Sequence, residues 1–428
     1  MRTLRNGFVR LLCSLIAVGS LAVAAPASAD VVSDWNTLAV QFVNAAGRPP
    51  GPFAVFDLAM THIAIHDAVQ AYQDRFKTFA GPYPNSAGSP VAAVAAAAHD
   101  VLVSRFSIPS VNASLIAQVD AAYASYLASQ GLAVNNPGVA VGQLAALHII
   151  QNRANDGAFP PNPEVFTGST APGQWRPTPP GFAPMAGPWI GNMKPFVQKD
   201  TEGQLHEPPP PSLTSGLYTR DYNEVLGMGR RTNSARTPQQ TTMALFFSGN
   251  TVTILSGVVR SVALARLTDI GDSARLFALA YVSASDSAIN AWNNKRKYNV
   301  WRPSTAILNA ADDGNPRTDD DPVWLPLIND PPYPDYTSGA NSLTGAITRA
   351  LENFFDDDVW QFTATTNATE NGAAIAPRTY YSFSALADDV VDARVLLGIH
   401  FRFADEVARR QGKQSADQVF AHAFQPIR

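Results

Sequence analysis

The chain has 428 residues, is 46% hydrophobic and 15% charged, and carries a formal net charge of −4. This length and apolar content are enough for a large buried core and exclude a chain that is disordered throughout. The acidic balance argues against nucleic acid or an anionic membrane surface as a partner.

Residues 1–29 have the pattern of a secretory signal. The positive segment holds three arginines, Arg2, Arg5 and Arg10. An apolar run over 11–24 and the small residues 27–29 complete the pattern. Without the three arginines, 28 basic residues face 35 acidic ones, a net charge near −7. We expect a secreted or periplasmic mature chain that starts at Asp30, has no membrane span and lacks cysteine, because Cys13 lies in the signal.

Alanine-rich apolar runs with little strict alternation predict an all-α fold: helical bundles joined by long proline-rich loops. The expected helices cover 55–72, 90–106, 111–130, 137–155, 214–228, 238–247, 252–267, 273–293, 339–355 and 415–424. We expect one large domain over 30–428. Its first part, 30–211, would hold the N-terminal helices and a cover loop, and its second part, 212–428, would hold the C-terminal helices and the functional site.

The segment 159–211 is studded with prolines and is too long for a simple connection. It contains four large aromatic residues, Trp175, Phe182, Trp189 and Phe196, which a linker would not need. We interpret it as an ordered cover packed over the helices, at a pocket mouth. A wrapping belt without a ligand is the alternative.

Two other groups could bind a metal. His62 and His66 lie four residues apart beside Asp67, which suits a metal on a helix face, but no third ligand is evident. We favour a buried structural pair. The acidic segment 312–321 lacks the terminal glutamate of a calcium loop, so we interpret it as a solvated loop.

Residues 292–303 concentrate positive charge. Four cations, Lys295, Arg296, Lys297 and Arg302, lie among two tryptophans, Trp292 and Trp301. Cations this close repel one another unless an anion lies among them. A solvated helix end is the simpler interpretation, but it does not explain the tryptophans. We therefore favour an anion site.

Two further stretches fit such a site. Ser338 and Gly339 open a helix, and free N–H groups at a helix N-terminus favour an oxyanion, although an ordinary N-cap has the same sequence. Arg394 and His400 are six residues apart and do not share a helix face. They converge on one ligand only if the helix ends near Gly398.

Together these stretches resemble the signature of the vanadium-dependent haloperoxidases and the type 2 phosphatidic acid phosphatase superfamily. That signature has three parts in chain order. The first is a lysine separated by six residues from Arg-Pro, the second is Pro-Ser-Gly-His, and the third is Ser-Arg-x-x-x-Gly-x-His. Lys295 and Arg302-Pro303 match fully, Thr337-Ser338-Gly339-Ala340 matches in part, and Ala393-Arg394 with Gly398 and His400 lacks only the serine.

The resemblance implies that vanadate, or phosphate in the same site, is held by a shared set of groups: Lys295, Arg302, Arg394, Ser338 and the N–H of Gly339. It implies that His400 binds vanadium, or attacks phosphorus in the phosphatases. We therefore expect an exported haloperoxidase-like enzyme that oxidises halide with hydrogen peroxide and takes a small organic substrate in some cases. A homo-oligomer stays open.

Two departures weaken part of this expectation. The family's acid–base histidine is Ala340 here, and the aspartate that the phosphatases place after their histidine is Ala404, with Asp405 one residue late. Alanine moves no proton. Asn341, or a histidine such as His62 or His66, could take over part of the role. The alternatives are an acid-phosphatase-like phosphoester hydrolase, an oxyanion-binding protein and a non-redox enzyme.

Overall fold

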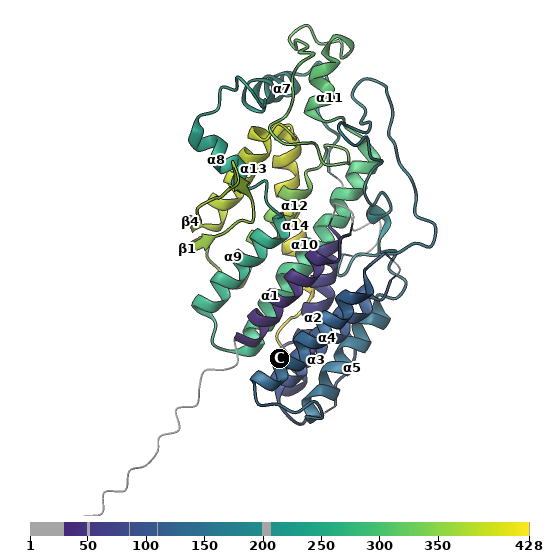
Figure 1. The fold of residues 1–428 in the computed structure, drawn as a ribbon, viewed down its shortest axis with the longest axis vertical. Coiled ribbons are helices and arrows are strands. Elements are labelled where there is room, and N and C mark those ends of the chain that lie inside the picture. Colours follow the sequence, from purple (N-terminus) through teal and green to yellow (C-terminus); the bar gives the residue numbers. More distant parts are fainter. Residues whose placement is uncertain (1–29, 49–51, 85, 109, 199–206, 428) are drawn as a thin grey trace, which may run out of the picture.

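The computed structural model describes residues 30–48, 52–84, 86–108, 110–198 and 207–427. The expected signal, residues 1–29, lies outside them. The fold is all-α, as the sequence predicts, and it also contains small β-hairpins (Figure 1).

The N-terminal bundle consists of α1 (Asp30–Ala45), α2 (Phe53–Gln73), α3 (Pro90–Phe106), α4 (Ala113–Ser129) and α5 (Pro137–Asn152). Helix α2 is buried on nearly every side because α3, α5 and α10 all pack against it. The starts of α4 and α5 are fixed by asparagine caps, whose side chains accept the N–H groups of Ser114 and Gly138. The four helices predicted in this half lie within a few residues of α2 to α5, whereas α1 was not predicted.

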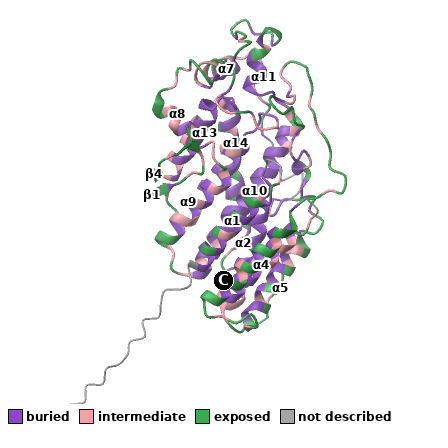
Figure 2. Cartoon of the chain, viewed as in Figure 1, coloured by how far each residue is buried: buried purple, intermediate pink, exposed green. Residues whose placement is uncertain are grey.

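The longest helix, α10 (Ile270–Tyr298), passes through the middle of the molecule and contacts helices from both halves. It is buried along most of its length (Figure 2). Helices α7 (Gly216–Met228), α8 (Pro238–Phe246) and α9 (Thr251–Arg266) precede it. A capping box between Thr237 and Gln240 starts α8, as predicted. Because α10 runs five residues beyond the predicted end, Lys295 lies on the helix itself.

The C-terminal elements are α11 (Pro303–Leu308), α12 (Gly339–Phe355), α13 (Phe383–Leu396) and α14 (Arg402–His422). Between α12 and α13 lie two antiparallel hairpins that the sequence analysis missed. One pairs β1 (Val359–Ala364) with β4 (Arg378–Ser382), and the other pairs β2 (Thr369–Glu370) with β3 (Ala373–Ala374). Short 3₁₀ turns occur at Ile190–Asn192 and Ala310–Asp312.

The predicted last helix, 415–424, begins at the wrong residue. Helix α14 starts at Arg402 and continues through Gly412, because this glycine serves packing and does not break the helix. A Cβ on Gly412 would lie 2.3 Å from the carbonyl oxygen of Ser342 on α12. Gly345 of α12 is equally close to the Arg409 carbonyl oxygen, at 2.2 Å. The two backbones thus touch where α12 and α14 cross.

The described parts of the proline-rich segment are ordered and packed on the helices. Asp286 on α10 accepts the backbone N–H groups of Phe196, Val197 and Gln198. The N–H of Trp175 donates to the Asn299 carbonyl at 2.7 Å. The segment therefore covers the helices as predicted. The prediction that it lies at a pocket mouth is wrong for its described residues, because none of them lines the cavity described in the next subsection.

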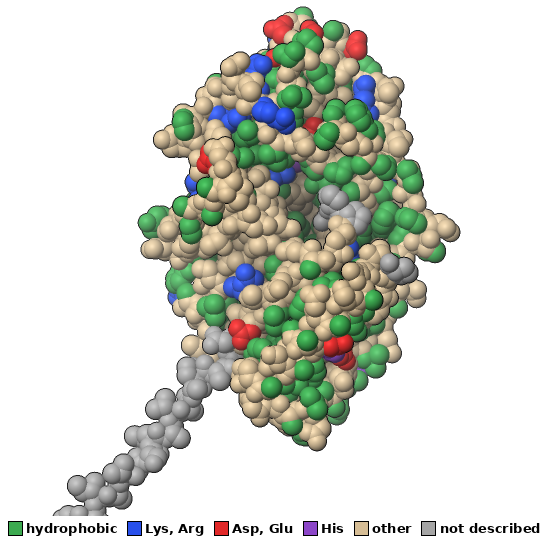
Figure 3. All heavy atoms as spheres, in the orientation of Figure 1, with side chains coloured by type: hydrophobic (Ala, Val, Ile, Leu, Met, Phe, Trp, Pro, Cys, Tyr) green, Lys and Arg blue, Asp and Glu red, His purple; other side chains and the backbone are tan. Residues whose placement is uncertain are grey.

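The surface carries no marked charge separation on the face that Figure 3 shows. Lys and Arg side chains there are scattered among neutral and apolar ones. Within the described ranges, no single helix has both the length and the hydropathy to cross a bilayer; only α8 and α9 taken together, bent by 86°, pass that test of length and composition.

Candidate oxyanion site

Lys295 occupies the last turn of α10 and is fully buried. Its ammonium group donates to the carbonyl oxygens of Pro334 (2.7 Å) and Asp335 (3.2 Å). Burial, and next the charge of Arg302, hold the pKa of Lys295 well below its usual value. The ammonium is therefore tied to the loop that leads into α12, next to a second cation.

Arg302 precedes α11 and is also fully buried. Its Nε donates to the Tyr333 carbonyl (2.8 Å) and its Nη1 to the Ile399 carbonyl (2.6 Å). It thereby joins the second and third sequence motifs. Its Nη2 is buried and has no hydrogen-bond partner among the described residues.

The N-terminus of α12 meets the start of α14. Ser338 caps α12, and its own N–H donates to the Ala404 carbonyl at 3.1 Å. The Asp405 carboxylate accepts the Asn341 amide at 2.7 Å, and its other oxygen is buried without a hydrogen-bond partner among the described residues. Burial raises the pKa of Asp405 to about 7, against the opposing effects of Ser338 and Arg394. The N–H groups of Gly339 and Ala340 have no partner among the described residues.

Arg394 lies in the last turn of α13, which ends at Leu396 as the convergence of the third motif requires. Gly398 then turns the chain at φ +78°, where a Cβ would lie 2.4 Å from the Gly229 carbonyl oxygen. This turn carries His400 back toward Arg394, and the charge of Arg394 contributes to the lowered pKa of His400. The Nε of Arg394 is buried without a partner among the described residues.

His400 lies between a carboxylate and a guanidinium. Asp335 Oδ1 is 2.6 Å from His400 Nδ1, and Arg302 Nη1 is 3.2 Å from His400 Nε2. The first contact lacks the alignment of a regular hydrogen bond. Arg302 Nη1 also lies 3.5 Å from His400 Nδ1, so the guanidinium approaches both ring nitrogens. Because arginine only donates hydrogen bonds, at least one ring nitrogen must offer it a lone pair.

Burial and the three cations hold the pKa of His400 well below its usual value. Burial also raises the pKa of Asp335 well above its usual range, although Arg302 opposes this shift. The sequence analysis did not select Asp335. Its position three residues before Ser338, inside a motif that had been singled out, was the available signal.

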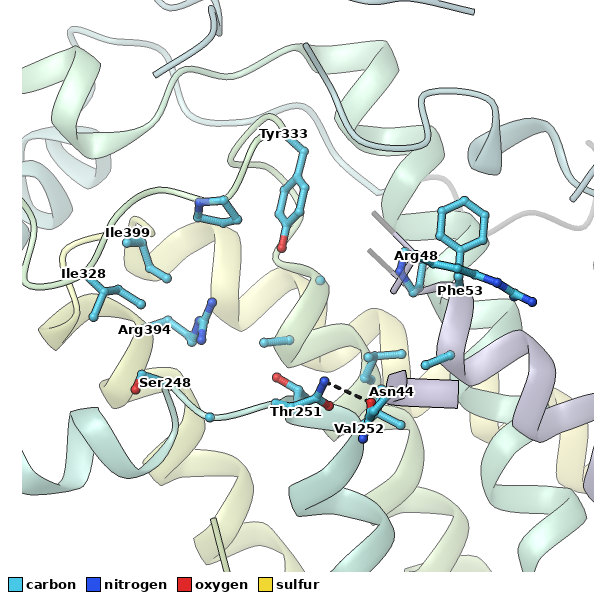
Figure 4. Close-up of a pocket in the computed structure, with 18 of the residues that line it drawn as sticks. Asn44, Arg48, Phe53, Ser248, Thr251, Val252, Ile328, Tyr333, Arg394 and Ile399 are labelled. Carbon is cyan, nitrogen blue, oxygen red and sulfur yellow. Dashed lines mark hydrogen bonds between the residues drawn. The ribbon is translucent and has the colours of Figure 1, made fainter. Parts of the chain in front are cut away.

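A cavity of about 400 Å³ opens beside these residues. Of the six predicted site residues, Gly339 and Arg394 line it, together with Trp292, Tyr333 and Ala340. Figure 4 shows Arg394 and Tyr333 at this cavity. The other four, Lys295, Arg302, Ser338 and His400, lie fully buried and are not part of its lining.

The remaining candidates lie elsewhere. His62 is stacked on Phe277 and Tyr281 and bonded to Asn36, and burial lowers its pKa to about 3. His66 contacts Asp67 at 3.1 Å. The described residues hold no cluster of three or more His, Cys, Asp or Glu side chains suited to a metal ion. In the acidic segment, Asp313 is buried and accepts the N–H of Asn315, so that segment is not solvated throughout.

The second pair of cations in the first motif does not join the site. Arg296 contacts Glu164 at 2.5 Å and is 31% exposed, and Lys297 is exposed. Asn341 is committed to Asp405 and does not replace the proton carrier missing at position 340.

The donor set fits an oxyanion. Arg302 Nη2, Arg394 Nε and the N–H groups of Gly339 and Ala340 are donors without partners among the described residues, and three cations surround them. Buried donors of this kind are stabilised by a ligand that accepts hydrogen bonds. Two buried carboxyl groups, those of Asp335 and Asp405, lie among these cations, which was not predicted from the sequence.

Comparisons with known proteins show which chains this one is similar to. The family model described as the VCPO second helical-bundle domain matches residues 275–428. Vanadium chloroperoxidase of Curvularia inaequalis is 29% identical over 184 aligned positions, which cover 35% of this chain and 30% of that protein. The chain is a vanadium haloperoxidase-like protein. The match spans less than a third of the length of that curated relative.

Solved structures extend the likeness of this haloperoxidase-like protein to its whole fold. A bacterial vanadium-dependent iodoperoxidase superposes with a TM-score of 0.76 at 23% identity, covering 93% of this chain and 98% of that one. An apo-type bacterial vanadium-dependent chloroperoxidase gives a TM-score of 0.69 at 16% identity, covering 88% and 94%. At these identities the likeness concerns the fold.

Proposed function

We propose that this protein is an exported vanadium-dependent haloperoxidase that oxidises halide with hydrogen peroxide. The observation that carries the proposal is the convergence of three buried cations and His400 on unpartnered donors at the start of α12. Lys295, Arg302, Arg394, Ser338 and the Gly339 N–H would hold vanadate, with His400 Nε2 as the vanadium ligand. Bound vanadate supplies Lewis acidity that activates peroxide.

The residues of the chain have separate tasks in this proposal. Arg302 and Arg394 direct N–H groups at the oxyanion and neutralise its charge, because arginine forms strong charge-assisted hydrogen bonds. Asp335 holds the His400 proton on the Nδ1 side, which leaves Nε2 as the donor atom. The cavity beside Arg394 and Gly339 would admit peroxide, halide and a small organic substrate.

The test is peroxide-dependent oxidation of iodide, bromide and chloride by the vanadate-loaded protein. His400→Ala should abolish turnover, whereas His422→Ala, an exposed histidine at the end of α14, should not change it. A parent protein that binds vanadate but oxidises none of these halides contradicts the proposal. Cleavage of a signal at residue 29 would be checked by the N-terminal sequence of the exported protein.

One observation favours a second candidate function, phosphoester hydrolysis. The phosphatases need a carboxylate that orients the nucleophilic histidine, and Ala404 cannot supply it. Asp335 lies against His400 Nδ1 from a different segment. Hydrolysis of a simple phosphate monoester without peroxide, lost in His400→Ala, would establish this activity.

A further inference from the structure

Position 340 leaves the site without its expected proton carrier. Ala340 lines the cavity, so the space that a larger side chain would fill is open to a ligand. A peroxide-dependent halide oxidation consumes one proton for each hypohalous acid and water formed. If a side chain of the protein supplies this proton, that side chain must face the cavity.

The described lining of the cavity offers few choices. Its ionisable side chains are Arg48, Arg394 and Tyr333, and the others are apolar, amide or alcohol groups. Arginine does not release a proton in proteins, and aliphatic alcohols are weak acids. Arg48 is in addition paired with Asp57 at 2.5 Å. Among the described lining residues, Tyr333 is the one whose side chain carries an ionisable O–H.

Tyr333 is held in place by the site itself. Its carbonyl accepts Arg302 Nε at 2.8 Å and its N–H donates to the Pro331 carbonyl at 2.8 Å. The ring packs against Trp292 with centroids 5.1 Å apart. The Lys295 ammonium lies 4.9 Å and the Arg302 guanidinium 5.0 Å from the ring centroid. The ring therefore contacts two of the three cations that would hold the oxyanion.

The hydroxyl of Tyr333 is free to act on a ligand. It has no hydrogen-bond partner among the described residues, and it is not enclosed like the orphaned donors behind it. Figure 4 shows the phenol directed into the cavity, on the side of Arg394. Its interaction with Arg394 also raises the pKa of that arginine, although burial lowers it more.

We propose that Tyr333 is a catalytic residue that supplies the O–H missing at Ala340. This inference rests on the proposed function. The O–O bond of peroxide breaks as the halogen–oxygen bond forms, and the halide electron pair reduces the peroxide. The departing oxygen takes the Tyr333 proton and leaves as water. A proton taken up from bulk solvent then returns to the phenolate, so the cycle consumes the one proton that the overall reaction requires.

The central variant is Tyr333→Phe, which keeps the ring and its contacts and removes only the hydroxyl. Turnover should fall by roughly 10²-fold, the lower end for general acid–base catalysis. Tyr381→Phe, an exposed tyrosine on β4, is the matched control and should leave turnover unchanged. Ala340→His should restore turnover in the Tyr333→Phe background and add much less to the parent. Equal gains in both backgrounds, or a Tyr333→Phe protein as fast as the parent, overturn the inference.

A readout independent of turnover completes the test. The Cζ atom of Tyr333, which bears the hydroxyl, is observed by NMR in protein labelled with ¹³Cζ-tyrosine. Its resonance is assigned as the one that is missing from the spectrum of Tyr333→Phe. Inorganic phosphate and vanadate should each shift this resonance if the hydroxyl donates to the bound anion. No shift at saturating anion overturns the inference. If the parent and all variants lack peroxidase activity, the proposed function is refuted. The Tyr333 resonance would then still show whether the hydroxyl contacts the bound anion.

Discussion

Asp335 Oδ1 lies 2.6 Å from His400 Nδ1, and both side chains are buried from solvent. The carboxylate comes from the loop before α12 and the histidine from the loop after α13, so two motifs far apart in the sequence meet in one pair. It places a carboxyl group among the donors that would bind an anion.

Removing that carboxyl group should tighten anion binding at a pH where it is ionised. In Asp335→Asn we expect the phosphate dissociation constant to fall about tenfold at such a pH, since a like charge a few ångströms from a ligand costs at least that much at intermediate dielectric. Calorimetric titration measures it, with Asp313→Asn, a buried carboxylate in another loop, as the control. Weaker binding in Asp335→Asn would mean that holding His400 matters more than the charge.

The two buried arginines should matter more than the two outer cations of the first motif. Arg302→Ala and Arg394→Ala should each weaken phosphate binding by about 2–3 kcal/mol, because each removes a buried charge-assisted donor. Arg296→Ala and Lys297→Ala should cost less than about 1 kcal/mol, as expected for exposed charges. Melting curves at increasing phosphate concentration give the comparison. Similar losses in all four variants would indicate a diffuse basic patch.

Anion binding should depend on the protonation of Asp405. Burial raises its pKa to about 7, so the group is mostly neutral below that pH and negative above it. Sulfate, whose own charge is constant in this range, should bind roughly tenfold more tightly at about pH 6 than at about pH 8. Asp405→Asn should flatten the profile near its low-pH level. If sulfate binding depends on pH in the same way in the parent and in Asp405→Asn, a group other than Asp405 is responsible for the pH dependence.

The same shift has a consequence for stability. The pKa of Asp405 rises from 3.8 to about 7 on folding, so the folded protein keeps a proton that the unfolded chain has released between these values. The contribution of Asp405 to the free energy of unfolding is therefore complete below about pH 4 and is lost as the pH rises to about 7. Urea unfolding of the parent and Asp405→Asn across this range should show the slope in the parent alone.

The crossing of α12 and α14 should tolerate no Cβ. Gly412→Ala places a carbon 2.3 Å from the Ser342 carbonyl oxygen, so the two backbones must separate, and we expect a loss of about 2–3 kcal/mol of stability. Because α12 carries Ser338 and Gly339, phosphate affinity should fall as well. Gly227→Ala in α7, where a Cβ meets open space, is the control and should be neutral or slightly stabilising. Equal melting temperatures would contradict the close packing.

The sequence located the site because charge and glycine leave local signals. Lys295, Arg302, Ser338, Gly339, Arg394 and His400 lie together as the three motifs predict. The convergence of Arg394 and His400 depends on a helix end near Gly398, and α13 does end at Leu396.

The carboxylates of the site were harder to predict. Asp335 and Asp405 are ordinary acidic residues in sequence, and only tertiary packing buries them among cations. The helix predicted over 415–424 starts too late for a related reason, because Gly412 lies inside α14. A glycine that breaks a helix and a glycine that admits a second backbone have the same sequence, and the partner, Ser342, lies 70 residues away.

The indole of Trp292 contacts the proline-rich segment, the start of α12 and the cavity. Its Nε1 donates to the Ala186 carbonyl of the proline-rich segment at 3.0 Å, and its six-membered ring lies 3.1 Å from the position of a Cβ on Gly339. It also lines the cavity and is 3% exposed. Indole emission responds to nearby charge and polarity, so the protein contains an optical reporter at the site. Subtracting the fluorescence of Trp292→Phe from that of the parent would isolate this one tryptophan among the seven and follow ligand entry in real time without an added label.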